Sequence, residues 1–172
     1  MFKTFKMIFN NLKKNFYISL IVPVFIFTID RISKIYVISL SNKSFDNELL
    51  SSKFLNITLV WNEGIAFGLL SVSNDYWYNF LTIVIASIAL IILIISIRHT
   101  GAEKYFLLVV FGGALGNLYD RIFFKAVPDF FDLHIDNFHW FVFNIADIFI
   151  TFGVIMLILC EVLPLNKYYE KK

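Results

Sequence analysis

The chain is short of charged residues and of cysteine. Charged side chains make up 16% of its 172 residues, whereas a soluble domain of ordinary composition carries about 25%. Cys160 is the single cysteine, so the chain has no internal disulfide, and its place in an apolar run is typical of a packing residue. The formal net charge of +2 gives no reason to expect a nucleic-acid partner. These shortages argue against a charge-rich soluble domain and against a disulfide-stabilised one.

Apolar residues dominate what is present. Hydrophobic side chains make up 59% of the chain, 21 residues are phenylalanine, and the mean hydropathy is +0.74. A helix needs about 20 apolar residues to cross the hydrocarbon core of a bilayer. We therefore predict a single integral membrane domain, residues 1–172, whose four spanning helices cover residues 17–39, 77–97, 105–118 and 143–163. The third is short, but its glycine-rich segment 112–116 favours close packing between helices.

Lysine and arginine are distributed unevenly between the two sides of these helices. Residues 1–14 contain four of them, residues 98–104 two and residues 167–172 three, whereas the opposite connections, 40–76 and 121–142, hold four in total. Cytoplasmic connections carry an excess of basic residues. We therefore predict that both termini are cytoplasmic and that residues 1–14 form a basic segment on the membrane surface.

The two outer connections are predicted to have structure of their own. Residues 54–61 alternate in polarity and are rich in β-branched and aromatic types, which predicts a strand or short hairpin. Residues 121–142 are rich in aromatic side chains, which favours a loop at the level of the lipid headgroups. The expected fold is an all-α membrane protein of four transmembrane helices, with a small extracytoplasmic β element and an aromatic outer loop.

Carboxylates and amides gather near the outer ends of the predicted helices. Asn-x-x-Asp units occur at Asn117–Asp120 and at Asn144–Asp147, and Asp129 lies between them. Carboxylates at a membrane edge are costly to desolvate, so a chain that keeps several there usually uses them. The sequence therefore places its candidate chemistry within residues 113–147.

Each of these groups also has a purely structural explanation. Asn144 and Asp147 fit a helix N-cap with an acid in the first turn. Asp120 and Arg121, which follow the predicted third helix, fit an interfacial ion pair. Asp129 fits a solvated loop residue.

Two further pairs of residues have a local interpretation. Asp30 and Lys34 are four residues apart in the first predicted helix, so they can pair along one face as a buried polar strut. Asn62 and Gly64 follow the predicted strand and are typical of a turn.

The aromatic outer segment also contains residue types that bind metal ions. His134 and His139, together with Asp129 and Asp132, contain the right ligand types. They lack the His-Glu-x-x-His spacing of metallopeptidases. We therefore expect no metal.

Five blocks of sequence carry a resemblance to a known family. They are D-R-I-S-K (30–34), N-E-G-I-A-F-G (62–68), G-G-A-L-G-N-L-Y-D-R (112–121), V-P-D-F (127–130) and F-N-I-A-D (143–147). With these blocks in order over residues 20–163, the chain resembles the lipoprotein signal peptidases (signal peptidase II), which are bacterial membrane aspartyl peptidases. The resemblance implies removal of the signal peptide from diacylglyceryl-modified prolipoproteins, on the amino side of the lipidated Cys. It also implies a site at the outer leaflet of the bacterial cytoplasmic membrane.

The resemblance assigns residues as well. It implies that Asp129 and Asp147 form a catalytic pair that shares a proton. It implies supporting or substrate-binding roles for Asp30, Lys34, Asn62, Gly64, Asn117, Asp120, Arg121, Asn144 and Ala146. Asn117 and Arg121, four residues apart on one helical face, are expected to hold carbonyl groups of the substrate. No metal or cofactor is expected, the expected partners are the prolipoprotein and membrane lipids, and the protein is expected to act as a monomer.

Two other classes of function stay open at this point. A small proton-coupled transporter or channel subunit would use Asp30, Asp120 and Asp147 as a proton relay. Such a relay needs acids at several depths, and only Asp30 is expected to lie deep in the membrane. A non-enzymatic assembly protein would use the acids only to brace helix ends. Cleavage of a lipid-modified precursor separates both from a peptidase.

Overall fold

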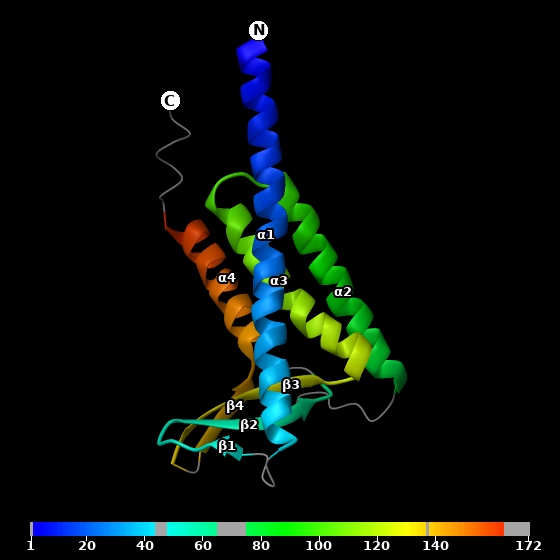
Figure 1. Cartoon of the computed structure of the whole chain (residues 1–172), viewed down its shortest axis with the longest axis vertical. Coiled ribbons are helices and arrows are strands. Elements are labelled where there is room, and N and C mark those ends of the chain that lie inside the picture. The colour runs from blue at the N-terminus through cyan, green and yellow to red at the C-terminus, as the bar shows by residue number, and fades with distance from the viewer. Residues whose placement is uncertain (1, 44–47, 65–74, 137, 164–172) are drawn as a thin grey trace.

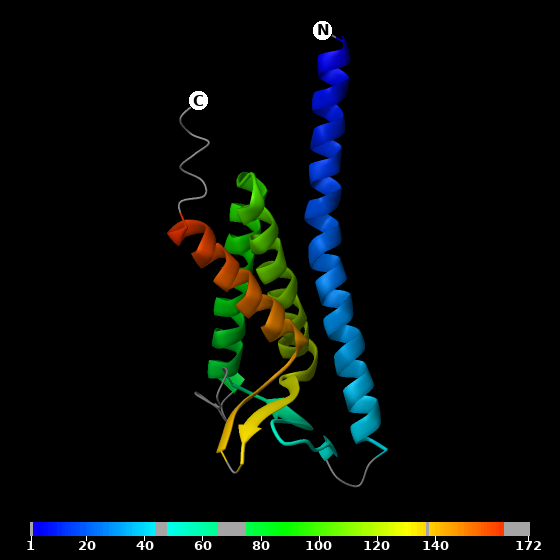
Figure 2. The ribbon, with the colours of Figure 1, turned by 90° about the vertical axis from the view of Figure 1, so that its left-hand side faces the viewer.

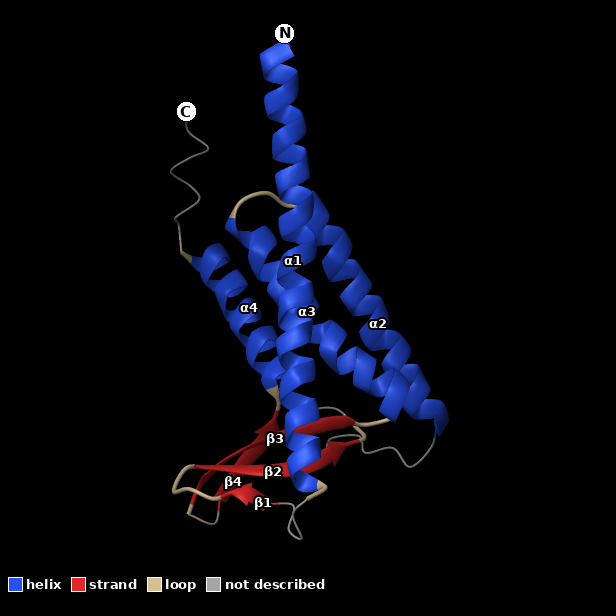
Figure 3. Cartoon of the chain, viewed as in Figure 1, coloured by secondary structure: helices blue, strands red, loops and turns tan. Residues whose placement is uncertain are grey.

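The computed structural model describes residues 2–43, 48–64, 75–136 and 138–163. Within these residues there are four helices and one sheet (Figure 3). The helices are α1 (Phe2–Ser41), α2 (Asp75–Arg98), α3 (Ala102–Phe124) and α4 (Ile145–Val162). The strands are β1 (Glu48–Leu50), β2 (Leu55–Asn62), β3 (Val127–Ile135) and β4 (Phe138–Phe143). The fold is mostly helical with a small antiparallel sheet, in agreement with the expected class.

Helix α3 occupies the centre of the helical part and contacts α1, α2 and α4. Its glycines allow this, because a Cβ at Gly112 would lie 2.9 Å from Pro23 Cα of α1. A Cβ at Gly113 would lie 2.6 Å from the carbonyl oxygen of Ala146 in α4. The predicted packing role of residues 112–116 is therefore confirmed, since side chains here would push the neighbouring helices away.

The sheet closes one end of the helices, and α1 extends beyond the other helices at the opposite end (Figures 1 and 2). The N-terminal end of α1, the connection between α2 and α3 and the C-terminal end of α4 all lie away from the sheet (Figure 1). The predicted basic segment 1–14 is, from Phe2 onward, a continuation of α1.

Three helices of the described residues are long and apolar enough to cross a membrane: Tyr76–Arg98, Ala102–Phe124 and Ile145–Val162. α1, which contains Asp30, Arg31 and Lys34, is not among them. The predicted end of the third helix at residue 118 was wrong, because α3 continues to Phe124. Asp120 is therefore an internal residue of a helix and not its terminus.

The predicted strand at 54–61 is confirmed as β2, the second strand of an antiparallel sheet with the order β1-β2-β3-β4. The predicted aromatic loop at 121–142 was wrong in large part, since these residues form the end of α3, the strand β3 and most of β4. Aromatic residues favour strands when the neighbouring strand offers them a surface. Here β2 and β3 pair with Asn62 opposite Val127 and Val60 opposite Asp129. This register sets Asp129 beside the end of β2.

Candidate functional site

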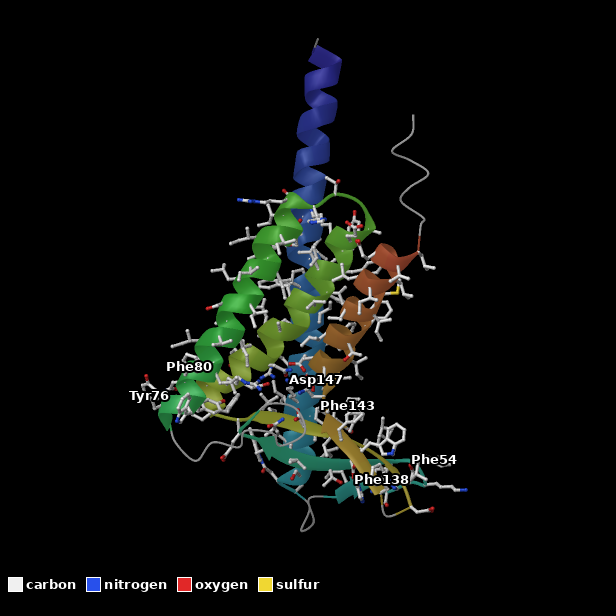
Figure 4. All side chains as sticks on the ribbon, turned by 180° about the vertical axis from the view of Figure 1, so that it is seen from behind. Phe54, Tyr76, Phe80, Phe138, Phe143 and Asp147 are labelled. Atoms are coloured by element: carbon white, nitrogen blue, oxygen red, sulfur yellow. The ribbon has the colours of Figure 1, made fainter. Side chains whose placement is uncertain are left out.

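A pocket of about 340 Å³ lies where α3, the start of α4 and the strands β3 and β4 meet. Both Asp129 and Asp147 line it, and Figure 4 shows Asp147 where α4 joins the sheet. The remaining lining residues are Asn62, Asn117, Arg121, Val127, Phe141, Val142, Phe143, Ile150 and Thr151. Two carboxylates that are 18 residues apart in the chain therefore face one space.

Asp129 is a buried residue of β3, with 4% of its surface exposed. Asn62 Nδ2 donates a hydrogen bond of 2.9 Å to Asp129 Oδ2, and Asn144 Nδ2 donates one of 2.6 Å to Oδ1. Burial and the charge of Asp147 raise the pKa of Asp129 to about 6, although both amides favour its ionised form and act in the opposite direction. The interpretation of Asp129 as a solvated loop residue was wrong, because the side chain is buried in a strand.

Asp147 occupies the first turn of α4 and is hydrogen-bonded to two residues, Asn144 and Asn117. Asn144 caps the helix: its side-chain Oδ1 accepts a hydrogen bond of 3.1 Å from the Asp147 backbone amide, and its backbone amide donates one of 3.1 Å to Asp147 Oδ2. Asn117 Nδ2 donates a hydrogen bond of 2.8 Å to Asp147 Oδ1. The predicted N-cap is confirmed, and the same contacts fix the direction in which the carboxylate points.

Two asparagine side chains connect the two carboxylates. The amide of Asn144 that binds Asp129 also donates a hydrogen bond of 3.1 Å to Asn117 Oδ1. The Asn117 amide binds Asp147 in turn. A continuous path of hydrogen bonds thus runs from Asp129 through Asn144 and Asn117 to Asp147, so movement of one carboxylate is coupled to the other.

Behind this path lies a buried cluster of four charged side chains. Lys34 Nζ contacts Asp30 Oδ2 at 2.9 Å, confirming the predicted i, i+4 pair, and Asp120 Oδ2 at 2.7 Å. Arg31 also reaches both acids, at 3.0 Å for Asp30 and 2.6 Å for Asp120. Asp30, Lys34 and Asp120 are fully buried. The predicted ion pair of Asp120 with its neighbour Arg121 was wrong, because Asp120 binds α1 instead.

The charged cluster is joined directly to the site. Lys34 Nζ donates a hydrogen bond of 2.9 Å to Asn117 Oδ1, and Asp30 Oδ1 accepts one of 3.1 Å from the backbone amide of Ala146. Asp30 has room for this contact because Gly116 has no side chain: a Cβ there would lie 2.5 Å from Asp30 Oδ2. An acid on α1 thereby binds the positive end of the α4 dipole.

Arg121 lies at the side of the pocket and holds the turn after β2. Its Nη2 donates a hydrogen bond of 2.9 Å to the carbonyl oxygen of Gly64. The Gly64 amide donates one of 3.0 Å to Asn62 Oδ1, which confirms the predicted turn. Residues 65–68 of that sequence block lie outside the described residues.

The two histidines of the hairpin have other partners. The rings of His134 and His139 stack with their centroids 5.2 Å apart. His139 Nδ1 lies 2.7 Å from Asp132 Oδ2, and His134 Nε2 lies 3.0 Å from Asn56 Oδ1. Across the described ranges no three His, Cys, Asp or Glu side chains are grouped closely enough to hold a metal ion.

Two features of the site were not predicted from the sequence. Arg31 neutralises the buried acids, and its place beside Asp30 in the D-R-I-S-K block was an available signal. The apolar wall of the pocket, formed by Phe141, Val142, Phe143 and Ile150, had no such signal. These residues belong to two elements, β4 and α4. They line one pocket because the chain turns between the end of β4 and the start of α4.

The sequence is similar to one family model and to curated proteins that share one name. A model of the family described as "Signal peptidase (SPase) II" matches residues 22–163. A protein of Pelagibacter ubique named "Lipoprotein signal peptidase" is 45% identical over 159 residues, covering 92% of this chain and 96% of that protein. One of the same name from Aquifex aeolicus is 39% identical over 152 residues, covering 87% and 89%.

A solved structure is also similar to this fold. It is described as "Bacterial membrane enzyme structure by the in meso method at 2.3 A resolution". It superposes with a TM-score of 0.67 at 31% sequence identity, covering 90% of this chain and 93% of that one.

Proposed function

The chain belongs to the signal peptidase II family and removes signal peptides from prolipoproteins, and from this premise we propose that Asp129 and Asp147 are the catalytic pair of an aspartic peptidase. One observation carries the proposal: the two carboxylates line a single pocket and are connected through Asn144 and Asn117. The pKa of about 6 at Asp129 supports it. A carboxyl group of that pKa holds a proton close to neutral pH, which a two-carboxylate mechanism requires.

The reaction needs one ionised and one protonated carboxyl group. The ionised member accepts a proton from water, and the water oxygen attacks the carbonyl carbon of the scissile peptide bond. The protonated member donates a hydrogen bond to the carbonyl oxygen and stabilises the negative charge that forms there. The carbon–nitrogen bond then breaks and the leaving amine receives a proton. The pair titrates jointly, so the shared proton belongs to both residues.

The surrounding residues divide by their contacts into two groups. Asn62, Asn117 and Asn144 donate hydrogen bonds to the carboxylates and hold them in place. Asp30, Lys34 and Asp120 join α1 to α3, and Asp30 also binds the Ala146 amide of α4, so their role is to position α4 and Asn117. Both groups support the geometry of the two carboxylates.

Arg121 is the residue best placed to contact substrate. It lines the pocket, and it is the one positively charged side chain among the lining residues that the structure describes. The Asn117 side chain is already bound to Lys34, Asn144 and Asp147. We therefore assign the substrate carbonyl contact to Arg121 and a supporting role to Asn117.

The substrate is proposed to be a prolipoprotein whose Cys carries a diacylglyceryl group, cleaved on the amino side of that Cys. The pocket supports this assignment because its polar groups lie beside an apolar wall of Phe141, Val142, Phe143 and Ile150. A substrate that is part lipid and part peptide needs both kinds of surface at the membrane edge.

We further propose that α1 is a fourth membrane span. Its charged residues Asp30 and Lys34 are fully buried and form a neutral group with Arg31 and Asp120, which removes most of the cost of placing them in a bilayer. Most of the α1 side chains that the structure describes as exposed are apolar, among them Leu20, Ile21, Val24, Phe25, Ile32 and Ile35. Four spans set both ends of the chain on the cytoplasmic side of the bacterial inner membrane and the sheet on the outer side, in a protein that acts as a monomer.

The decisive experiment is precursor processing in a bacterial strain that lacks its own lipoprotein signal peptidase. The wild-type protein should convert a lipid-modified precursor to the mature form, and Asp129→Asn should not, although it accumulates in the membrane. Processing should persist when strong chelators are added to isolated membranes. Loss of activity with a chelator and recovery with zinc would favour a metal mechanism through His134 and His139. A proton relay through Asp30 and Asp120 is disfavoured, because Arg31 and Lys34 hold both acids in ion pairs.

A further inference from the structure

Thr151 lies in the wall of the pocket, further from the sheet than the carboxylates. Asp147, Ile150 and Thr151 are spaced i, i+3 and i+4 on α4, so they share one face, and all three line the pocket. α4 runs away from the sheet (Figure 1), so Thr151 lies about 6 Å along the helix axis from Asp147, on the membrane side. The adjacent lining residue on α4, Ile150, is apolar.

The hydroxyl group of Thr151 donates no hydrogen bond to a described residue, unlike the hydroxyl groups of several other helical threonine and serine residues in this protein. In helices, threonine usually donates its hydroxyl to the carbonyl oxygen four residues earlier. Thr28 and Thr82 do so, at 2.7 and 2.9 Å, and Ser87 does so at 2.8 Å. Thr151 forms no hydrogen bond with any residue that the structure describes, and its side chain is exposed to the pocket. A free donor on α4 therefore faces the pocket.

The substrate brings unpaired acceptors to this depth. A signal peptide that crosses the membrane as a helix must unwind before the scissile bond, because cleavage needs an extended segment between the two carboxylates. The last four carbonyl groups of a helix have no partner within it. In an apolar environment each such group costs several kcal/mol. A hydroxyl about one helical turn inward of the carboxylates is at a depth where such a carbonyl group would need a donor.

We propose that the Thr151 hydroxyl donates a hydrogen bond to a backbone carbonyl of the signal peptide, on the amino side of the cleavage site, and so caps the unwound end of that helix. This rests on the proposed catalytic pair, since the depth of the carbonyl is measured from Asp147. The contact makes Thr151 a substrate-binding residue that favours peptides able to unwind one turn before the lipidated Cys. Ile150 and the wall residues supply the apolar surface around the same segment.

The test compares Thr151→Val with Thr151→Ser in purified protein, using a synthetic lipopeptide that contains the cleavage site and the lipidated Cys. Valine keeps the branched shape and removes the hydroxyl, so kcat/KM should fall about 5- to 10-fold, the effect of one lost hydrogen bond. Serine keeps the hydroxyl, so its kcat/KM should stay within about twofold of the wild type. Thr82→Val is the matched control, because the Thr82 hydroxyl is bonded within its own helix, and it should have wild-type activity. Each kcat/KM is taken per amount of folded protein, so a folding defect cannot imitate the result.

A second substrate separates the peptide carbonyl from the ester carbonyls of the lipid. With an ether-linked dialkylglyceryl group on the Cys, the deficit of Thr151→Val should remain. If the deficit disappears with the ether-linked lipid, the hydroxyl contacts the lipid and the proposal is wrong. Wild-type kcat/KM in Thr151→Val likewise overturns it, while an inactive Asp129→Asn measured alongside would leave the catalytic pair intact. Cleavage by Asp129→Asn would overturn the pair itself and the proposal with it.

Discussion

The side-chain amide of Asn144 lies 2.6 Å from Asp129 Oδ1. The residue that caps α4 therefore also holds the carboxylate on β3. The position of Asp129 thus depends on the start of the helix that carries Asp147, so the two carboxylates behave as one unit.

Replacing either carboxylate should abolish cleavage. Asp129→Asn and Asp147→Asn each remove the ionisable group that a shared proton needs, so precursor processing should fall below detection while protein accumulates in the membrane. Residues that act as a unit are not additive, so the double variant should be no worse than either single one. Cleavage by Asp129→Asn, with a well-folded but inactive Asp120→Asn beside it, would move the assignment to Asp120.

Asn62→Ala should move the pH dependence of cleavage to higher pH. Asn62 donates to Asp129 Oδ2 and so stabilises the ionised form, which lowers the pKa of Asp129 from what burial alone would give. Removing the donor raises that pKa above its value of about 6. The alkaline limb of kcat/KM against pH should therefore shift upward by about one pH unit.

Asn56→Ala provides the matched control for this shift. Asn56 lies on the same strand but pairs opposite Asp132 in the sheet, so its alkaline limb should match that of the wild type. An unchanged limb in Asn62→Ala would mean that Asp129 does not determine the pH profile.

Gly116→Ala should destabilise the protein even though alanine favours helices. The helix preference alone would stabilise by about 1 kcal/mol. The new Cβ would lie 2.5 Å from Asp30 Oδ2, and Arg31 and Lys34 hold that carboxylate in place. We expect a net loss on the order of 1–3 kcal/mol, measured as a lower thermal unfolding midpoint in detergent. Ser87→Ala, at an exposed site on α2, is the control, and equal midpoints for the two variants would show that Asp30 can move aside.

The buried charges should be more sensitive to imbalance than to removal. Lys34→Met leaves Asp30 and Asp120 with Arg31 as their one remaining cation in the cluster, and breaking a buried ion pair costs about 3–5 kcal/mol. Adding Asp120→Asn restores neutrality, because Asp30 and Arg31 remain as a pair. The double variant should therefore unfold at a higher temperature than Lys34→Met, while its cleavage stays low because Asn117 has lost the Lys34 donor. If the double variant instead lost as much stability as the two single variants lose together, the charge balance would not be what stabilises the cluster.

Chemical labelling should place the sheet outside the cytoplasm. In a Cys160→Ala background, Lys53→Cys, close to the start of β2, should react with a membrane-impermeant thiol reagent added to intact cells. Thr100→Cys, in the connection between α2 and α3, should react only after the membrane is permeabilised. Both residues are exposed on the protein. A failure to react would therefore mean that the membrane separates the thiol from the reagent. The opposite pattern would reverse the proposed topology.

Local sequence was enough to predict several features of this protein. The apolar runs predicted where the four helices lie, because about 20 apolar residues are typical of a helix that crosses a bilayer. They did not predict that α1 and α3 continue beyond these runs. The spacing of Asp30 and Lys34 and the cap formed by Asn144 on Asp147 were also predictable. These interactions join residues within four positions of each other, and helix geometry alone brings them together.

Tertiary structure decided the contacts that make a site. Asp120 binds Lys34 across 86 positions of the chain, and Ala146 binds Asp30 across 116. The paired strands β3 and β4 replaced a predicted loop because β2 supplied an edge for β3 to bind. No local pattern contains these partners, since they depend on how closely α3 approaches α1 and α4 at Gly112, Gly113 and Gly116. The sequence by itself determined which residues are ionisable and which segments are apolar, because both are properties of the residues themselves. Helix packing and strand pairing determined which carboxylates are neutralised by α1 and which two face the pocket.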